Sequence, residues 1–175
     1  GGVHGKTETT EFKVMNPNSR VPVLDDNNFI LYESNAILRY LSKKFDILVE
    51  EKKEIRGKID QWIDWGSFTF ASPCSLLTAH KLSLPQDQRD ELIAEKAKND
   101  IFSLLNILNI HLAKKDFIVD EKFSLADMPL GIWCHRCVNL KISFDNFPNI
   151  NNWYIKLKKM NSFQNTVVSS PLPPN

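Results

Sequence analysis

The stretch from residue 16 to residue 41 constrains the fold more than any other part of the chain. It contains three tetrapeptides in the order apolar, turn-forming and apolar: Val-Pro-Val-Leu at 21–24, Asp-Asp-Asn-Asn at 25–28 and Phe-Ile-Leu-Tyr at 29–32. This order predicts a β-hairpin, and Pro22 lies at the start of its first strand, where proline is tolerated. Glu33 and Ser34 follow at once and precede apolar residues at helical spacing, which predict a helix to about Lys44.

The rest of the chain shows helical patterns only. After a charged linker around Glu-Glu-Lys-Lys-Glu, apolar residues recur every three or four positions, and no strand-like segment follows. The change in composition and period marks a boundary near residues 46–52. We therefore predict an α+β protein with a small αβ unit at 1–46 and an all-helical domain at 52–175.

Four long helices are expected in the second domain. The first begins near Ile55 and ends near Pro73, and its stripe includes Trp62 and Gly66. The second starts at Pro85 and buries one stripe of apolar residues, namely Leu92, Ile101, Leu105, Leu108 and Leu112. The third begins at Ser124 with Asp127 three residues later, a capping box with Asp in the usual Glu position. The fourth covers 149–159.

Composition excludes several classes of function. The net charge is +1, from 22 basic and 21 acidic side chains, so nucleic acid is not indicated as a partner. No apolar run approaches the roughly 20 residues of a membrane span, and the start carries no apolar signal segment. We therefore expect no membrane association and a cytoplasmic location.

The cysteines and histidines do not form a recognisable metal or redox motif. Cys134 and Cys137 share a face of the predicted third helix, and no second pair supplies further ligands. A redox pair of the thioredoxin type would instead follow a strand. We expect these thiols and Cys74 to be reduced and packed in the interior, the four histidines to titrate as ordinary surface groups, and no metal site to exist.

Taken in order, the motifs resemble those of the cytosolic glutathione transferases. They are Asn16-Pro17, Val21-Pro22-Val23-Leu24, Glu33-Ser34-Asn35-Ala36-Ile37, Trp62-Ile63-Asp64-Trp65, Phe123-Ser124-Leu125-Ala126-Asp127 and Phe147-Pro148-Asn149-Ile150. They span the chain and are most similar to a theta-like or nu-like bacterial and fungal branch. The resemblance implies a thioredoxin-like unit, incomplete here, followed by the family's helical domain.

The resemblance also implies a glutathione site. In the family the proline that corresponds to Pro22 is cis, so that Val21 can pair through its backbone with the cysteinyl unit of glutathione. Ser34, at a helix N-terminus, would bind the γ-glutamyl carboxylate, and Glu33 would accept from the neighbouring ammonium. Arg20 would lie near the glycyl carboxylate. Taken singly, Pro22 could be an ordinary strand-edge proline, and Glu33 and Ser34 a simple helix cap.

Family members carry a strand, a helix and a strand ahead of the segment that here starts at Gly1. That stretch holds the residue that stabilises the glutathione thiolate, so we expect no catalytic residue in this chain and predict an N-terminally truncated product or partial gene model. The strand at Val21 would then have an unpaired edge, open to aggregation or to another chain.

The implied reaction is attack of the glutathione thiolate, with glutathione as co-substrate, on a small apolar electrophile or a disulfide. Trp65 and Thr69, on the first long helix, are candidates for the second-substrate pocket, although most aromatic residues at helical spacing belong to a core. The family usually forms homodimers. The alternative is a non-catalytic binding or assembly module of the same fold, as found in translation factors and stress proteins.

Overall fold

The protein was analysed as a computed structural model that describes residues 5–119 and 121–170. The chain divides into two compact units, residues 1–49 and 50–175, and each is considered by itself. The division falls within the predicted linker. Strands occur in unit 1, and the described residues of unit 2 form helices and loops alone, which confirms the predicted α+β class.

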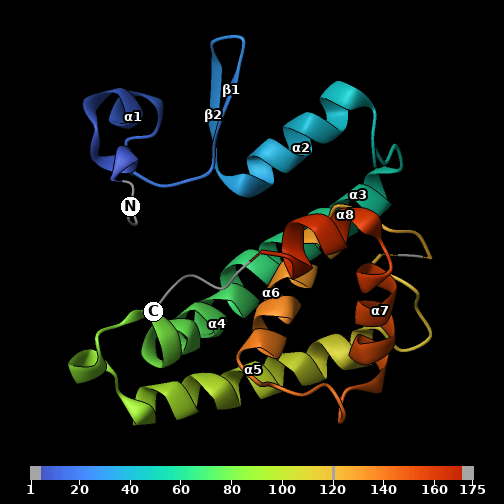
Figure 1. Ribbon diagram of the computed structural model, residues 1–175. Coiled ribbons are helices and arrows are strands. Elements are labelled where there is room, and N and C mark those ends of the chain that lie inside the picture. The colour runs from blue at the N-terminus through green and yellow to red at the C-terminus, as the bar shows by residue number, and fades with distance from the viewer. Residues whose placement is uncertain (1–4, 120, 171–175) are drawn as a thin grey trace. The chain divides into compact units, whose positions relative to one another are not determined.

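Unit 1 combines a β-hairpin with helices before and after it (Figure 1). In chain order its elements are a 3-10 turn at Lys6–Glu8, α1 at Thr10–Met15, β1 at Val23–Asp26, β2 at Phe29–Tyr32 and α2 at Ser34–Phe45. The strands are antiparallel, and their register runs from Val23 opposite Tyr32 to Asp26 opposite Phe29. The hairpin and the helix predicted after Glu33 are thus both present.

The turn of the hairpin is shorter than the predicted four residues. Asn27 and Asn28 alone connect the strands, with φ values of 54° and 69°. Two consecutive left-handed residues match the type I′ turn, whose twist fits the strands, and asparagine tolerates this conformation better than most residues. Asp25 and Asp26 therefore belong to β1, and Pro22 lies just before the strand.

A polar cluster ties the hairpin to α2. The Tyr40 hydroxyl donates to Asp26 Oδ2 at 2.6 Å, and Lys44 Nζ pairs with the same oxygen. The ring centroids of Tyr40 and Phe29 also lie 5.1 Å apart. The hydrogen bond from Lys44, and after it that from Tyr40, lowers the pKa of Asp26. The carboxylate thus links a strand to a helix through contacts between distant residues.

We predict that this cluster makes the hairpin sensitive to acid. Because the pKa of Asp26 is lowered in the folded chain, its pairing stabilises unit 1 above the ordinary aspartate pKa of about 3.9 and is lost as the pH falls through the folded value. Asp26→Asn should reduce amide-exchange protection in β1 and β2 at neutral pH, and the difference from wild type should close in acid. Glu11→Gln, on exposed α1, is the control. Equal protection of both proteins at neutral pH would contradict the prediction.

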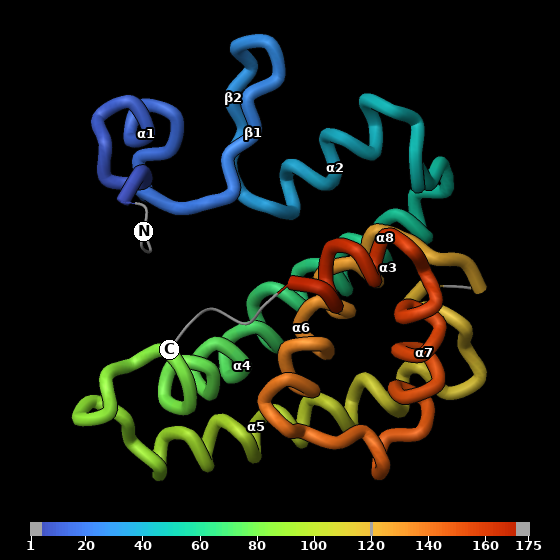
Figure 2. Tube along the Cα trace, in the orientation of Figure 1, coloured from blue at the N-terminus to red at the C-terminus, as the bar shows by residue number. Residues whose placement is uncertain are grey.

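Unit 2 is a bundle of helices, whose path Figure 2 follows from green to red. Its elements are α3 at Lys53–Asp64, a π-helical turn at Trp65–Phe70, α4 at Ala71–Thr78, a second π-helical turn at Ala79–Ser83, a 3-10 turn at Gln86–Gln88, α5 at Glu91–His111, α6 at Asp127–Asn139, α7 at Pro148–Lys158, α8 at Asn161–Phe163 and a third π-helical turn at Gln164–Val168.

The first helical stretch of unit 2 continues beyond Pro73, where it was predicted to end. The π-helical turn lies directly before this proline, and the amide of Ala71 donates to the carbonyl of Gly66 five residues back. Proline has no N–H group to donate to the carbonyl of the preceding helical turn. The wider π-helical turn displaces the carbonyl groups of that turn, so the helix can continue through the proline. Gly66 also packs closely, since a Cβ there would lie 3.1 Å from Leu130 Cγ on α6.

The predicted stripe of α5 is correct except at its beginning. Ile101, Leu105, Leu108 and Leu112 are all buried, whereas Leu92 is 83% exposed. The helix starts at Glu91 rather than Pro85, because the Asp90 side chain accepts from the amides of its first turn. Leu92 therefore lies in the solvated first turn, and Ala94 and Ala97 continue the buried stripe.

The predicted capping box at the start of α6 is extended by two further contacts. The amide and hydroxyl of Ser124 both donate to Asp127 Oδ2, at 2.9 and 3.0 Å. Asp127 Oδ1 accepts from the amide of Ile118 at 2.9 Å and from the indole of Trp153 at 2.8 Å. The residue is fully buried, and burial raises the pKa of Asp127 although these four donors oppose that effect. One side chain thus joins α6, α7 and the loop before them.

Candidate functional site

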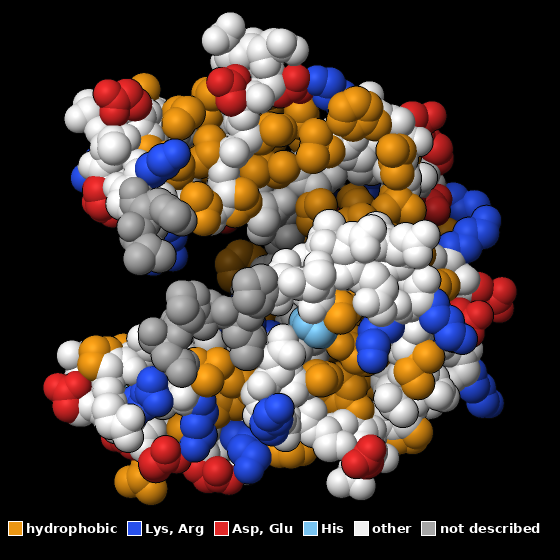
Figure 3. Space-filling view, viewed as in Figure 1, with side chains coloured by type: hydrophobic (Ala, Val, Ile, Leu, Met, Phe, Trp, Pro, Cys, Tyr) orange, Lys and Arg blue, Asp and Glu red, His pale blue; other side chains and the backbone are white. Residues whose placement is uncertain are grey.

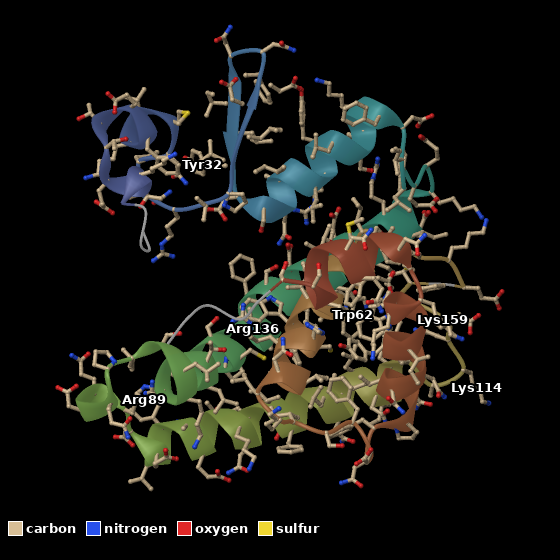
Figure 4. The ribbon with its side chains drawn as sticks, in the orientation of Figure 1. Tyr32, Trp62, Arg89, Lys114, Arg136 and Lys159 are labelled. Atoms are coloured by element: carbon tan, nitrogen blue, oxygen red, sulfur yellow. The ribbon has the colours of Figure 1, made fainter. Side chains whose placement is uncertain are left out.

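The five residues predicted to bind a peptide gather at the open end of the hairpin. Val23 pairs with Tyr32, so the chain enters β1 and leaves β2 at the end opposite the Asn27–Asn28 turn. Pro22 and Val21 precede β1, and Glu33 follows β2 directly. Tyr32 is the last residue of β2, and Figure 4 labels it between the hairpin and α1. The hairpin therefore explains why the Val21-Pro22 motif and the Glu33-Ser34 motif lie close together.

Val21 offers free backbone to a ligand. The Val21–Pro22 peptide bond is cis, in agreement with what the family resemblance implied. Val21 is 72% exposed, and within residues 5–119 and 121–170 its amide and carbonyl make no hydrogen bond. An extended peptide could pair with these groups as an added strand does.

Glu33 and Ser34 form the N-terminus of α2, and both are exposed. Glu33 is the N-cap residue, with φ 72° and ψ 111°, a conformation that costs an L-residue about 1–3 kcal/mol. Its side chain makes no capping bond, and its carbonyl accepts the first helical bond from Ile37. The Ser34 amide and hydroxyl lack partners in the described part of the chain, so the positive end of the helix dipole is available to an anion.

Asn16 organises the loop that leads into this site, a role that the sequence did not reveal. Only 3% of it is exposed. Its Nδ2 donates to the carbonyl of Arg20 at 2.7 Å, and its Oδ1 accepts from the amide of Asn18 at 3.0 Å. Ser19 between them has φ 54°. The side chain thus sets the backbone path of Arg20, whose own side chain is exposed, and of Val21 after it.

The two residues proposed for a second-substrate pocket lie one turn apart in the π-helical turn of unit 2. Trp65 is half-buried and packs between Trp62, at 5.0 Å between ring centroids, and Phe70, at 5.6 Å. Thr69 is exposed beside Phe68, which is 77% exposed. Trp62 itself belongs to the core, and Figure 4 labels it inside unit 2.

The cysteines fit the expectation of packed thiols. Cys74, Cys134 and Cys137 are free and fully buried, and the sulfur atoms of Cys74 and Cys137 lie 3.6 Å apart. Burial raises the pKa of Cys134 well above its ordinary value, and the contact with Cys74, followed by burial, does the same for Cys137. Protonated interior thiols are poor nucleophiles. Among the described residues, no group of three or more His, Cys, Asp or Glu could hold a metal ion.

Two of the four histidines are not the ordinary surface groups that were expected. His111 stacks on Trp62 at 4.0 Å, and its Nε2 contacts the carbonyl of Ile118 at 2.7 Å. His135 Nδ1 lies 2.6 Å from the Tyr154 hydroxyl. Burial lowers the pKa of both imidazoles. His4 lies outside the described residues. Helical spacing alone gave no signal for contacts between separate segments.

These features define a protein with a small αβ unit, which carries an exposed backbone and a free helix N-terminus, and a second unit made of helices. Family models give the same division: the glutathione S-transferase N-terminal domain matches residues 3–43, and the glutathione S-transferase C-terminal domain matches residues 70–159. The chain belongs to the glutathione S-transferase family.

Relatives and solved structures agree with this membership. Glutathione S-transferase GstB of Escherichia coli is 26% identical over 172 residues, covering 96% of this chain and 83% of that protein. The theta class glutathione S-transferase of Xanthomonas axonopodis pv. citri, with glutathione bound, superposes with a TM-score of 0.90 at 29% identity, covering 97% of this chain and 83% of that one. The predicted combination of a thioredoxin-like unit and a helical domain is thereby confirmed.

Elongation factor 1-gamma of Danio rerio is also similar. It is 29% identical over 143 residues, covering 79% of this chain but 31% of that protein.

The described helices include none with the length and apolar character needed to cross a membrane.

Proposed function

We propose that unit 1 binds glutathione and that the protein acts as a glutathione transferase. The observation that carries the proposal is the joint exposure, at one end of the hairpin, of a free backbone at Val21 and a free helix N-terminus at Ser34. Glutathione is a peptide with an anionic end, so it needs both a backbone partner and an anion site. The bound glutathione of the Xanthomonas relative supports the same ligand.

Each residue has a separate role in the proposal. Val21, presented by Pro22, pairs with the cysteinyl backbone. The Ser34 amide and hydroxyl bind the γ-glutamyl carboxylate, and Glu33 accepts from the adjacent ammonium. Arg20 attracts the glycyl carboxylate, a small contribution because its side chain is exposed. The strained backbone of Glu33 supports this assignment, since such conformations are common where a site must be held in one shape.

The proposed reaction is attack of the glutathione thiolate on an apolar electrophile or a disulfide. Trp65 and Thr69 are the candidates for contact with that second substrate, because one presents an aromatic surface and the other is exposed beside Phe68. The five residues of unit 1 hold the peptide, and the proposal gives none of them the task of lowering the pKa of its thiol.

The non-catalytic assembly module is the less favoured alternative. This chain spans 83% of GstB, whereas it spans 31% of elongation factor 1-gamma, most of whose length has no counterpart here. The match to a separate transferase is therefore the more complete one.

We also infer a homodimer and a cytoplasmic location. The family resemblance supports the dimer. The three free, buried cysteines support a reducing compartment, where thiols stay unpaired.

Retention on immobilised glutathione tests the proposal. Ser34→Ala removes the hydroxyl hydrogen bond to the carboxylate, and Glu33→Gln keeps an acceptor oxygen but removes the negative charge that faces the ammonium. Each should weaken binding about tenfold or more. The matched controls are Thr10→Ala, at the first position of α1, and Glu11→Gln beside it, both exposed and both expected to bind normally. Wild-type protein that passes through the column, or variants of the two sites that bind as the controls do, would refute the glutathione site. Turnover of a model electrophile would then support the transferase over the assembly module.

A further inference from the structure

A small pocket opens in unit 2 between α6 and the C-terminal π-helical turn. Its volume is about 200 Å³, below the roughly 300–1,000 Å³ of pockets that take drug-sized ligands. Four lining residues come from α6 and two from the C-terminal turn: Ile132, His135, Arg136, Asn139, Thr166 and Val167. They include a cation and two apolar side chains, and none is acidic. The pocket therefore suits a small ligand with a negative charge.

Arg136 is the charged group of the pocket. It is half-buried, and within the described part of the chain its guanidinium makes no ion pair or hydrogen bond. Figure 4 labels it on α6. A partly desolvated guanidinium is stabilised when an anion completes its donors, and its planar shape suits a carboxylate. A ligand could supply the partner that the chain does not.

His135 supplies a second donor through its contact with Tyr154. The Tyr154 hydroxyl lies 2.6 Å from His135 Nδ1 and has no other hydrogen-bond partner among the described residues. Because a phenol hydroxyl is a good donor and a neutral imidazole offers one acceptor nitrogen, we assign the hydroxyl as the donor and Nδ1 as the acceptor. Burial raises the pKa of Tyr154 to about 12, which keeps the phenol protonated. Burial, followed by the charges of Lys158 and Arg136, lowers the pKa of His135, which keeps the imidazole neutral. The imidazole proton is then on Nε2 and can be donated to a ligand.

The opposite wall of the pocket is different in character. The Thr166 hydroxyl donates to the carbonyl of Ser162 at 2.7 Å, and the hydroxyl of Ser170, which also lines the pocket, donates to the carbonyl of Thr166 at 2.5 Å. Both hydroxyl groups thus already donate their hydrogen within the chain and cannot donate it to a ligand. Val167 faces the pocket from the same segment. Donors lie on the α6 side, and the C-terminal side adds an apolar surface.

We propose that this pocket binds a small organic monocarboxylate, with its carboxylate on Arg136, Asn139 and His135 and its apolar part against Ile132 and Val167. Figure 3 shows a histidine side chain and several lysine or arginine side chains on the visible face of unit 2. The proposal concerns unit 2 alone and does not depend on the glutathione site.

Benzoate is the probe. Its binding to the full chain, without glutathione, is measured by the NMR signals of His135 and by calorimetry. We expect saturable binding below about 10 mM and a loss of about tenfold or more in Arg136→Gln, which removes a charge-assisted contact. Lys114→Gln is the matched control. Figure 4 shows Lys114 far from Arg136 within unit 2, and it is exposed, so this variant should bind as wild type does.

Two further comparisons test the orientation. Ile132→Ala should weaken benzoate but leave acetate unchanged, because acetate lacks the body that touches this side chain. Inorganic phosphate should bind more weakly than benzoate. The proposal is overturned by an absence of saturable binding, by equal affinities of Arg136→Gln and Lys114→Gln, or by phosphate binding as tightly as benzoate. None of these outcomes bears on retention by immobilised glutathione, so the two proposals can fail separately.

Discussion

Replacement of Asp127 by alanine is expected to lower the free energy of unfolding of unit 2 by about 4 kcal/mol. The substitution leaves four donors without an acceptor: the amide and hydroxyl of Ser124, the amide of Ile118 and the indole of Trp153. The exposed fraction is at most 1% for Asp127 and Trp153 and 8% for Ser124, so water cannot easily replace the carboxylate. Each unsatisfied buried group costs about 1–3 kcal/mol, with strong coupling among neighbours.

Urea denaturation measures this effect in a unit-specific way. All four tryptophans lie beyond residue 49, so their fluorescence reports unit 2 alone. Asp127→Asn keeps one acceptor and should cost about half as much. Asp100→Ala, at an exposed position of α5, is the control and should change stability by less than about 0.5 kcal/mol. A small loss in Asp127→Ala, similar to that of the control, would show that the network contributes little.

Replacement of Asn16 by alanine is expected to destabilise unit 1 by about 2 kcal/mol and to weaken glutathione retention as well. The Arg20 carbonyl and the Asn18 amide both lose their partner, and the buried side chain leaves space behind it. Asn16 is proposed as a positioning residue, because it acts on the path of Arg20 and Val21 and is given no contact with the peptide.

Asn18→Ala is the matched control for Asn16. It removes a side-chain contact with Asn16 Oδ1 at 3.1 Å but keeps the backbone bonds of the loop, so it should cost less than about 0.5 kcal/mol. Amide-exchange protection in β1 and β2 measures stability, and the NMR signals of α2 show whether the helix N-terminus is intact. Normal retention by Asn16→Ala with intact α2 signals would contradict the positioning role.

The parts of the fold that follow local rules were predicted closely. The hairpin and α2 were visible because period-two and helical patterns lie side by side around Glu33. The capping box at Ser124 and Asp127 was visible because its spacing is set within one helical turn. Errors arose where one side chain changes the local boundary: Asp90 moved the start of α5, and two asparagines shortened the hairpin turn.

Contacts between distant residues could not be predicted in the same way. The contact of Asp127 with Trp153, that of His135 with Tyr154 and that of Asp26 with Tyr40 each join residues 14 to 26 positions apart. Hydrophobic periodicity shows which face of a helix is buried, but it does not show which neighbour lies against that face. The histidines were therefore expected at the surface, and the α6 pocket was not anticipated.

The sequence by itself determined the α+β class and the order of the elements, since these depend on patterns within a few residues of one another. The five candidate residues for glutathione were instead implied by the resemblance to a known family. The tertiary structure alone decided that Val21 and Ser34 meet at one end of a hairpin, that Asn16 holds the loop before them, and that Arg136 lies in a pocket without a partner among the described residues. The physical reason is that the hydrogen-bond partners and the exposure of a side chain are properties of the packed chain. A sequence pattern specifies them only where both partners lie within a few residues of each other.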